Sequence, residues 1–205
     1  MSCTLQPKLL LAIMFVGLLP SSAMSSGKTS GHLLGGSLNS PIRLEVFSDF
    51  QCSHCRDFYL LTVRRILKEY SSKDLVCVIY HEFPLSTNRY SLEAARFSEA
   101  VSRLGRQKLL PLYDSLFVTQ PQWSRDGNLE EAVSKVLSSE DFQKVKRLLN
   151  DPSVNLAIDK EIELSREKGI HSTPTSIIYY TGKEQKVEGV VTYLVLKQFI
   201  NSILK

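Results

Sequence analysis

Two cysteines separated by two residues, Cys52 and Cys55, lie where the pattern of the chain changes from strand-like to helix-like. Residues 42–50 are rich in apolar and β-favouring types, whereas residues 56–70 place apolar side chains at helical spacing among good helix formers. A cysteine that begins a helix lies next to unpaired N–H groups at the positive end of the helix dipole, and these favour a thiolate over a thiol. The pattern therefore predicts thiol–disulfide exchange, with Cys52 as the reactive thiol at a strand-to-helix junction.

The first 23 residues differ in composition from the rest of the chain. One basic residue, Lys8, precedes an apolar run over residues 9–19, which is shorter than the roughly 20 residues that a membrane-spanning helix needs. Ser21 and Ala23 are small residues at the positions that cleavage after Ala23 requires. The segment is therefore predicted to be a secretory signal peptide over residues 1–23, with a short retained anchor or a buried helix as the alternatives.

Export changes how the remaining cysteines are interpreted. Cys3 would leave with the leader, so that the mature chain keeps Cys52, Cys55 and Cys77. An odd number argues against a disulfide scaffold and for one working pair with one buried thiol. Cys77 alternates with apolar residues along a predicted strand and is interpreted as an inert core thiol, the alternative being a third redox thiol.

Neither a metal ion nor nucleic acid is an expected partner. A zinc site needs four ligands, and neither a second cysteine pair nor a His-x-x-x-His pattern accompanies the first pair. The formal net charge is +4, and no basic stripe interleaved with aromatic residues is present. At 205 residues the chain is long enough for one well-filled domain, or for one domain that carries a substantial insertion.

The predicted elements divide the mature chain into four parts. Residues 24–41 are rich in serine and glycine and are interpreted as a flexible entry segment. Residues 42–87 contain a strand, the cysteine helix and a second apolar strand, an order that favours a parallel right-handed crossover. Residues 88–168 show helical patterns without a strand signal, and a loop is predicted over residues 120–123. Residues 169–205 return to a β-hairpin and end in an amphipathic helix.

Three stretches, taken in this order of elements, resemble a known family. They are Phe47-Ser-Asp-Phe-Gln-Cys52-Ser-His-Cys55, Phe83-Pro84-Leu85 and Gly169-Ile-His-Ser-Thr173-Pro174-Thr175. Together with a leader they are similar to the DsbA-like branch of the thioredoxin-fold proteins, and the resemblance extends over about residues 42–205. The fold class that it implies is α/β: a thioredoxin fold (β-α-β … β-β-α) with an inserted all-helical domain.

The resemblance assigns roles to the cysteine motif. Cys52 would be the exposed nucleophile that forms a mixed disulfide with a client protein, and Cys55 would attack the Cys52 sulfur to release it. Ser53 and His54 would tune the couple. A protonated His54 favours the neighbouring thiolate and so makes the disulfide more oxidising, unless it is merely an exposed histidine without effect.

Pro174 matches the cis-proline of the family, which lies beside the cysteine pair. Thr173 would then offer its backbone N–H and C=O to an extended substrate, in the manner of strand addition. The alternative is an ordinary proline at the first position of a strand, where proline is tolerated.

The chain also departs from the family's pattern. Ser53 replaces the proline that many relatives carry after the first cysteine, so the reduction potential cannot be copied across. Many relatives place a buried acid six residues before that cysteine, where this chain has Val46; Glu45 lies one residue earlier and faces the other side of the strand. Proton transfer to or from Cys55 is therefore assigned to Asp49, Glu45 or water, with a helix-start cap as the alternative role for Asp49.

The resemblance implies an exported, monomeric thiol–disulfide oxidoreductase that acts on cysteines of secreted client proteins, and we expect it to be a disulfide donor, an oxidase. No cofactor is implied beyond the redox-active disulfide Cys52–Cys55. A membrane redox partner, quinone-linked in bacterial members, would re-oxidise the pair. The expected location is the periplasm or another extracytoplasmic compartment, with a soluble protein after cleavage near Ala23. The alternatives are a reductase or isomerase kept reduced by a partner, and a non-catalytic, chaperone-like binding module.

Overall fold

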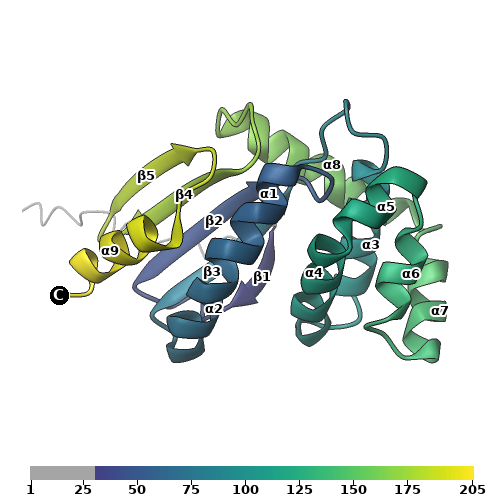
Figure 1. Ribbon diagram of the computed structural model, residues 1–205, viewed down its shortest axis with the longest axis horizontal. Coiled ribbons are helices and arrows are strands. Elements are labelled where there is room, and N and C mark those ends of the chain that lie inside the picture. Colours follow the sequence, from purple (N-terminus) through teal and green to yellow (C-terminus); the bar gives the residue numbers. More distant parts are fainter. Residues whose placement is uncertain (1–30) are drawn as a thin grey trace, which may run out of the picture.

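The computed structural model describes residues 31–205, so the predicted signal peptide over residues 1–23 lies outside the described residues. Its centre is a five-stranded sheet in the order β1-β3-β2-β4-β5 (Figure 1). The strands are β1 (His32–Gly35), β2 (Ile42–Ser48), β3 (Val76–Glu82), β4 (Thr175–Tyr180) and β5 (Lys183–Glu188). β2 and β3 are parallel, as the predicted crossover requires, and the other pairings in the sheet are antiparallel.

Strand β1 corrects, for residues 32–35, the prediction of a flexible entry segment over residues 24–41. Residues 32–35 pair antiparallel with β3 at the edge of the sheet. Glycine is needed here for close packing: a Cβ on Gly35 would lie 2.5 Å from Leu67 Cδ2, and Gly36 has a φ of 73°. Gly35 and Gly36, which contributed to the prediction of flexibility, therefore allow the tight packing of an edge strand.

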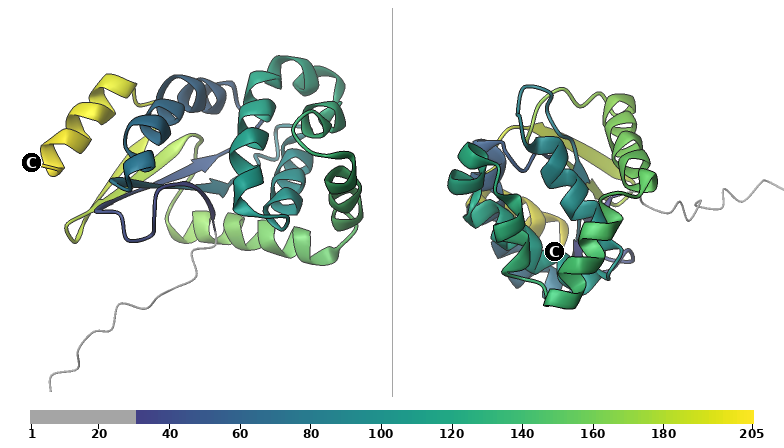
Figure 2. Two further views of the ribbon diagram at one scale, coloured as in Figure 1. Left: turned by 90° about the horizontal axis from the view of Figure 1, so that it is seen from below. Right: turned by 90° about the vertical axis from the view of Figure 1, so that its right-hand side faces the viewer.

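Helices cover both faces of the sheet, as the left view of Figure 2 shows. They are α1 (Ser53–Phe58), a π-helical turn η1 (Tyr59–Val63), α2 (Arg64–Glu69) and α9 (Tyr193–Ile203) on one face, and α8 (Pro152–Glu167) on the other. The first three are consecutive and form one helix over residues 53–69. Every residue of β3 is buried, as expected of a strand that is covered on both sides.

The segment between β3 and α8 is helical. Its helices are α3 (Ser91–Ser102), α4 (Leu109–Val118), α5 (Gln120–Asp126), α6 (Leu129–Ser134) and α7 (Ser139–Leu148). The predicted loop over residues 120–123 is wrong, because these residues begin α5. Pro121 lies in the first turn of that helix, where the missing N–H costs no helical hydrogen bond. Among residues 31–205, no helix is long and apolar enough to cross a membrane.

One hydrophobic core extends from the sheet into the inserted helices. Tyr113 of α4 packs edge-on against Tyr80 of β3, with ring centroids 5.2 Å apart, and against Phe50, at 4.9 Å. Phe117 stacks on Tyr59 with centroids 4.7 Å apart. The thioredoxin fold with a helical insertion is therefore confirmed, and the insertion packs directly against the region of the cysteine motif.

Candidate active site

The cysteine motif lies between the end of β2 and the start of α1. Cys52 is the N-cap residue of α1, with extended backbone angles (φ −74°, ψ 123°). Its N–H donates to the carbonyl of Asp49 at 3.1 Å, and its carbonyl accepts from the N–H of Arg56 at 3.1 Å, which is a first-turn hydrogen bond of the helix. The predicted strand-to-helix junction is thus the observed one, and it places Cys52 Sγ at the helix start.

The buried carboxylate of Asp49 organises the turn before Cys52. One of its oxygens accepts from the Gln51 N–H at 2.7 Å and from the Ser91 hydroxyl at 2.5 Å. The other accepts from the Leu85 N–H at 2.9 Å and from the Asn88 side-chain amide at 2.8 Å. Four donors therefore hold this carboxylate as a structural link to the segment after β3. Its role in proton transfer stays a prediction.

The two thiols differ in exposure and in pKa. Cys52 is half-buried, whereas Cys55 is fully buried in the main core. A hydrogen bond from the Cys55 thiol, helped by the backbone N–H groups of Cys55 and His54, lowers the pKa of Cys52 to about 5. Burial and the neighbouring Cys52 raise the pKa of Cys55 well above its ordinary value. The pair therefore keeps its shared proton on Cys55 and presents Cys52 as a thiolate at neutral pH.

Ser53 and His54 are exposed at the start of α1. The contribution of His54 to the low pKa of Cys52 comes from its backbone N–H. The predicted effect of the His54 ring charge on the couple stays a prediction, as does the tuning role of Ser53.

The turn before β4 brings Thr173 to the reactive sulfur. The Thr173–Pro174 peptide bond is cis, the geometry that the resemblance implies. Thr175, the first residue of β4, pairs with Phe47 of β2, which fixes the turn beside the cysteine motif. The Thr173 carbonyl oxygen lies 3.6 Å from Cys52 Sγ. The Thr173 hydroxyl is buried without a hydrogen-bonding partner among the described residues, yet lies close enough to lower the pKa of both thiols.

A family model described as thioredoxin matches residues 28–202, which is most of the chain. This chain belongs to the thioredoxin family. The cysteine pair at a helix start, the cis-proline turn and the helical insertion make it a DsbA-like member, and a thiol–disulfide oxidoreductase.

Relatives of this thioredoxin-family protein are distant in sequence. It is 22% identical over 151 residues to a probable disulfide bond formation protein D of Bacillus cereus, a match that covers 72% of this chain and 68% of the relative. The crystal structure of the thiol-disulfide exchange protein alpha-DsbA2 from Wolbachia pipientis superposes with a TM-score of 0.70 at 20% identity, covering 85% of this chain and 88% of the other. The catalytic domain of Proteus mirabilis ScsC gives a TM-score of 0.62 at 19% identity, with 87% and 92% covered. These structures share the fold.

Glu45 lies away from the cysteines, which corrects its predicted place in the site. The side chain is on the face of the sheet that α8 covers, whereas Cys55 lies on the face beneath α1, as the strand alternation indicates. Burial alone would raise the pKa of Glu45, but His81 and Lys168, each 3.7 Å from one carboxylate oxygen, lower it. Proton transfer from Glu45 to Cys55 would have to cross the sheet, so the geometry of this thioredoxin-family protein does not favour Glu45 for that step.

On the face of the sheet beneath Cys55, an apolar residue occupies the position of the family's acid, and the neighbouring strand β3 carries Tyr80 and Glu82. Val46, at the position of the acid in many relatives, is fully buried and pairs with Tyr80 of β3. The Tyr80 hydroxyl is buried and has no hydrogen-bonding partner among the described residues. Glu82 follows on the same face of β3 and accepts a 2.7 Å hydrogen bond from the Tyr113 hydroxyl. No sequence signal distinguishes these residues from ordinary strand positions.

Gln120 is another residue near the cysteine motif that the sequence analysis did not identify as part of the site. It begins α5, in the predicted loop, and its side chain donates to two backbone carbonyls of the cysteine motif. The two contacts join residues that are separated by 68 and 70 positions in the chain. They leave no local sequence pattern, so only the fold reveals them.

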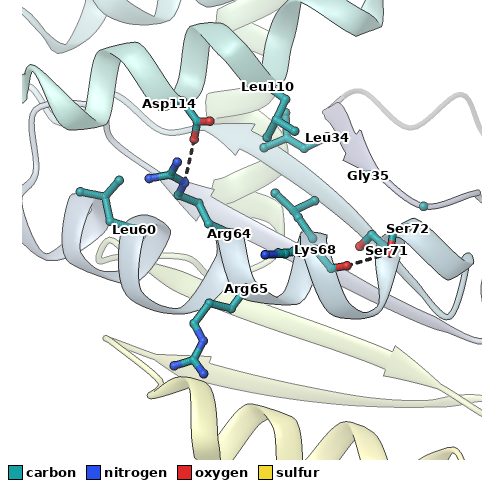
Figure 3. Close-up of a pocket in the computed structure, with 12 residues that line it drawn as sticks. Leu34, Gly35, Leu60, Arg64, Arg65, Lys68, Ser71, Ser72, Leu110 and Asp114 are labelled. Carbon is teal, nitrogen blue, oxygen red and sulfur yellow. Dashed lines mark hydrogen bonds and ion pairs between the residues drawn. The ribbon is translucent and has the colours of Figure 1, made fainter.

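A cavity of about 630 Å³ follows the seam between α2, β1 and α4 (Figure 3). Leucines from all three elements line it, and Arg64 of α2 pairs across the seam with Asp114 of α4 at 3.0 Å. The same carboxylate accepts a 2.8 Å hydrogen bond from the Tyr59 hydroxyl. None of its lining residues belongs to the cysteine motif or to the cis-proline turn, so the cavity is separate from the thiol chemistry.

Cys77 is fully buried, and burial raises its pKa to about 11. By alternation along β3 it faces away from the side chains of Tyr80 and Glu82, and so from α1. A thiol that is buried and protonated is unreactive, which supports the interpretation of Cys77 as an inert core residue. Among residues 31–205, no group of three or more His, Cys, Asp or Glu side chains could hold a metal ion.

Proposed function

We propose that this protein is an exported disulfide donor, which transfers the Cys52–Cys55 disulfide to cysteines of secreted client proteins. The observation that carries the proposal is the opposite displacement of the two pKa values: that of Cys52 is lowered to about 5, while that of Cys55 is raised. A stabilised Cys52 thiolate belongs to the reduced form, so it makes the disulfide a stronger oxidant. Each pKa unit of such stabilisation corresponds to about 1.4 kcal/mol, or about 30 mV in a two-electron couple.

The exchange proceeds in two displacements. A client thiolate attacks the Cys52 sulfur of the disulfide, forming a mixed disulfide, and Cys55 leaves as a thiolate that takes up a proton because of its high pKa. A second client thiolate then attacks the client sulfur of the mixed disulfide and expels Cys52. The client loses two electrons and gains a disulfide, while the cysteine pair is reduced. The low pKa of Cys52 speeds this last step, because a thiolate of low pKa is the better leaving group.

Thr173 is proposed to align the client. Its carbonyl is 3.6 Å from Cys52 Sγ, so an extended client segment that pairs with the backbone of Thr173 would present its sulfur next to Cys52. Recognition through backbone groups tolerates many sequences, which fits a donor that serves several clients. Ser53 and His54, exposed beside Cys52, are proposed to adjust the potential of the couple.

A location outside the cytoplasm and a membrane redox partner complete the proposal. The leader-like composition of residues 1–23 supports export, and a donor that is reduced by each turnover needs a partner that re-oxidises it. The name of the Bacillus cereus relative, a probable disulfide bond formation protein, supports the same direction of exchange.

The test is a single-turnover reaction with a reduced, unstructured peptide that contains two cysteines. The oxidised protein is mixed with the peptide, quenched with acid and alkylated, and both products are measured by mass spectrometry. We expect one peptide disulfide for each protein molecule reduced. With a peptide that contains a single cysteine, we expect the Cys52–peptide mixed disulfide to accumulate in a Cys55→Ala variant that has been activated at Cys52, because neither thiol that could resolve it is present. A protein that remains oxidised in the presence of excess reduced peptide would exclude the donor function. Client folding that is unchanged in Cys52→Ser would instead indicate a chaperone-like module.

A further inference from the structure

Gln120 is a buried side chain of the inserted helices that contacts the backbone of the cysteine motif. It is the first residue of α5 and is 3% exposed. Its Nε2 atom donates to the carbonyl of Phe50 at 2.6 Å and to the carbonyl of Cys52 at 2.9 Å. A single amide nitrogen thereby uses both of its hydrogens on two carbonyls that lie two residues apart.

These two carbonyls flank the turn that sets the position of Cys52. The Cys52 carbonyl also accepts from Arg56 N–H, so it is tied both to the helix and to Gln120. Gln120 thus holds the peptide group that follows Cys52 and the one that precedes Gln51, while the Cys52 N–H is bound to the Asp49 carbonyl at 3.1 Å, and together these bonds restrict rotation about the Cys52 backbone. The position of Sγ relative to the N–H groups of His54 and Cys55 depends on that rotation, and these groups lower the pKa of Cys52.

Besides the hydrogen bond from Ser91 to Asp49, other contacts between the inserted helices and the motif involve Gln51. Its side chain donates to the Ser124 carbonyl at 3.3 Å and accepts from the Tyr90 N–H at 2.7 Å. These contacts hold the Gln51 side chain, whereas Gln120 holds the peptide group of Cys52 itself. In Figure 1 the start of α1 and helix α5 both lie in the upper part of the view.

We propose that Gln120 is a positioning residue for the nucleophile, through which the inserted helices hold Cys52 in the geometry that stabilises its thiolate. The proposal depends on the thiol–disulfide activity of the protein but not on the direction of electron flow. The insertion would then control the reactivity of Cys52 as well as the shape of the surface around it.

The decisive variant is Gln120→Met, which is unbranched and of similar length but has no hydrogen-bond donor. Gln122→Met is the matched control, because Gln122 lies on the same helix and is exposed. Gln120→Glu keeps the shape of the side chain, and when protonated it can donate one of the two hydrogen bonds. It therefore serves as a partial rescue that depends on pH.

The measurement is the rate of Cys52 alkylation by iodoacetamide as a function of pH, with thermal unfolding followed by circular dichroism for each variant. We expect Gln120→Met to raise the midpoint of the profile by about one unit, which is about a tenfold loss of thiolate at a pH below both midpoints. Gln122→Met should leave the midpoint unchanged. The alkylation rate of Gln120→Glu should be closer to that of wild type in acid solution than in neutral solution.

A Gln120→Met protein with a lowered unfolding temperature and a wild-type midpoint would overturn the proposal, since Gln120 would then be structural only. If Gln120→Met does not fold, the pH profile of Gln120→Glu decides. An alkylation rate equal to that of wild type at every pH contradicts the proposal. Because both readouts concern the reduced protein alone, they are independent of whether it donates or accepts disulfides.

Discussion

Replacing Cys55 with alanine should raise the pKa of Cys52, because the hydrogen bond from the Cys55 thiol is the largest cause of its low value of about 5. A hydrogen bond to a charged group contributes about 1.5–3 kcal/mol, and one pKa unit is about 1.4 kcal/mol, so its loss corresponds to about one to two units. The N–H groups of His54 and Cys55 remain in Cys55→Ala. We therefore expect a midpoint of about 6–7, and an intermediate value for Cys55→Ser, whose hydroxyl can still donate.

The assay is a titration of thiolate absorbance in the ultraviolet. Cys77, with a pKa of about 11, does not ionise in the acid-to-neutral range, so a change in that range reports the active-site pair. Cys77→Ala is the control and should leave the midpoint in place. A Cys55→Ala midpoint that stays near 5 would refute the reasoning, because the helix start alone would then account for the low pKa of Cys52.

Three further predictions concern the framework of the site. Asp49→Ala should lower the free energy of unfolding by about 2–4 kcal/mol, because it leaves four hydrogen-bond donors without their acceptor. Urea unfolding measures this loss, and a change below about 0.5 kcal/mol would contradict the structural role of Asp49. Tyr80→Phe removes a buried hydroxyl that has no hydrogen-bonding partner among the described residues, so urea unfolding should show equal or greater stability. A loss above about 1 kcal/mol would show that the hydroxyl does form a hydrogen bond. Burial favours the neutral form of His32, but the carboxylates of Glu82 and Glu99 raise its pKa to about 9. The charged ring therefore contributes up to about 3 kcal/mol to the free energy of unfolding. This contribution is complete below pH ~6.5 and is lost as the pH rises towards 9. Unfolding measured across that range should be less pH-dependent in His32→Gln than in wild type, and equal slopes would exclude the effect.

The parts of the fold that the sequence predicts are those with a local signal. An apolar strand, a helical stripe and a hairpin each leave a period within a few residues, so β2, β3, β4 and α9 are recognisable. The two cysteines at the strand-to-helix junction and the Thr173-Pro174 pair are also local, and their distance in the chain matches a family pattern. The fold class and the reactive pair therefore follow from the amino-acid sequence alone.

The parts that the sequence does not predict depend on packing between distant segments. β1 is held by its pairing with β3 and by the buried ring of His32, which contacts Glu99 at 3.2 Å, and neither interaction has a signature in a Gly- and Ser-rich stretch. Gln120 acquires its role from carbonyls more than sixty residues away, and three of the four donors to Asp49 lie more than thirty residues away. A polar residue of this kind has the same appearance in the sequence as one that faces solvent.

The reduction potential of the Cys52–Cys55 couple, equilibrated in glutathione buffers, tests the disulfide-donor account most directly. Because the thiolate of Cys52 is stabilised in the reduced protein, we predict a potential towards the oxidising end of the range of such proteins, about −120 mV. A value near about −270 mV would contradict the account and assign the protein to the reductases.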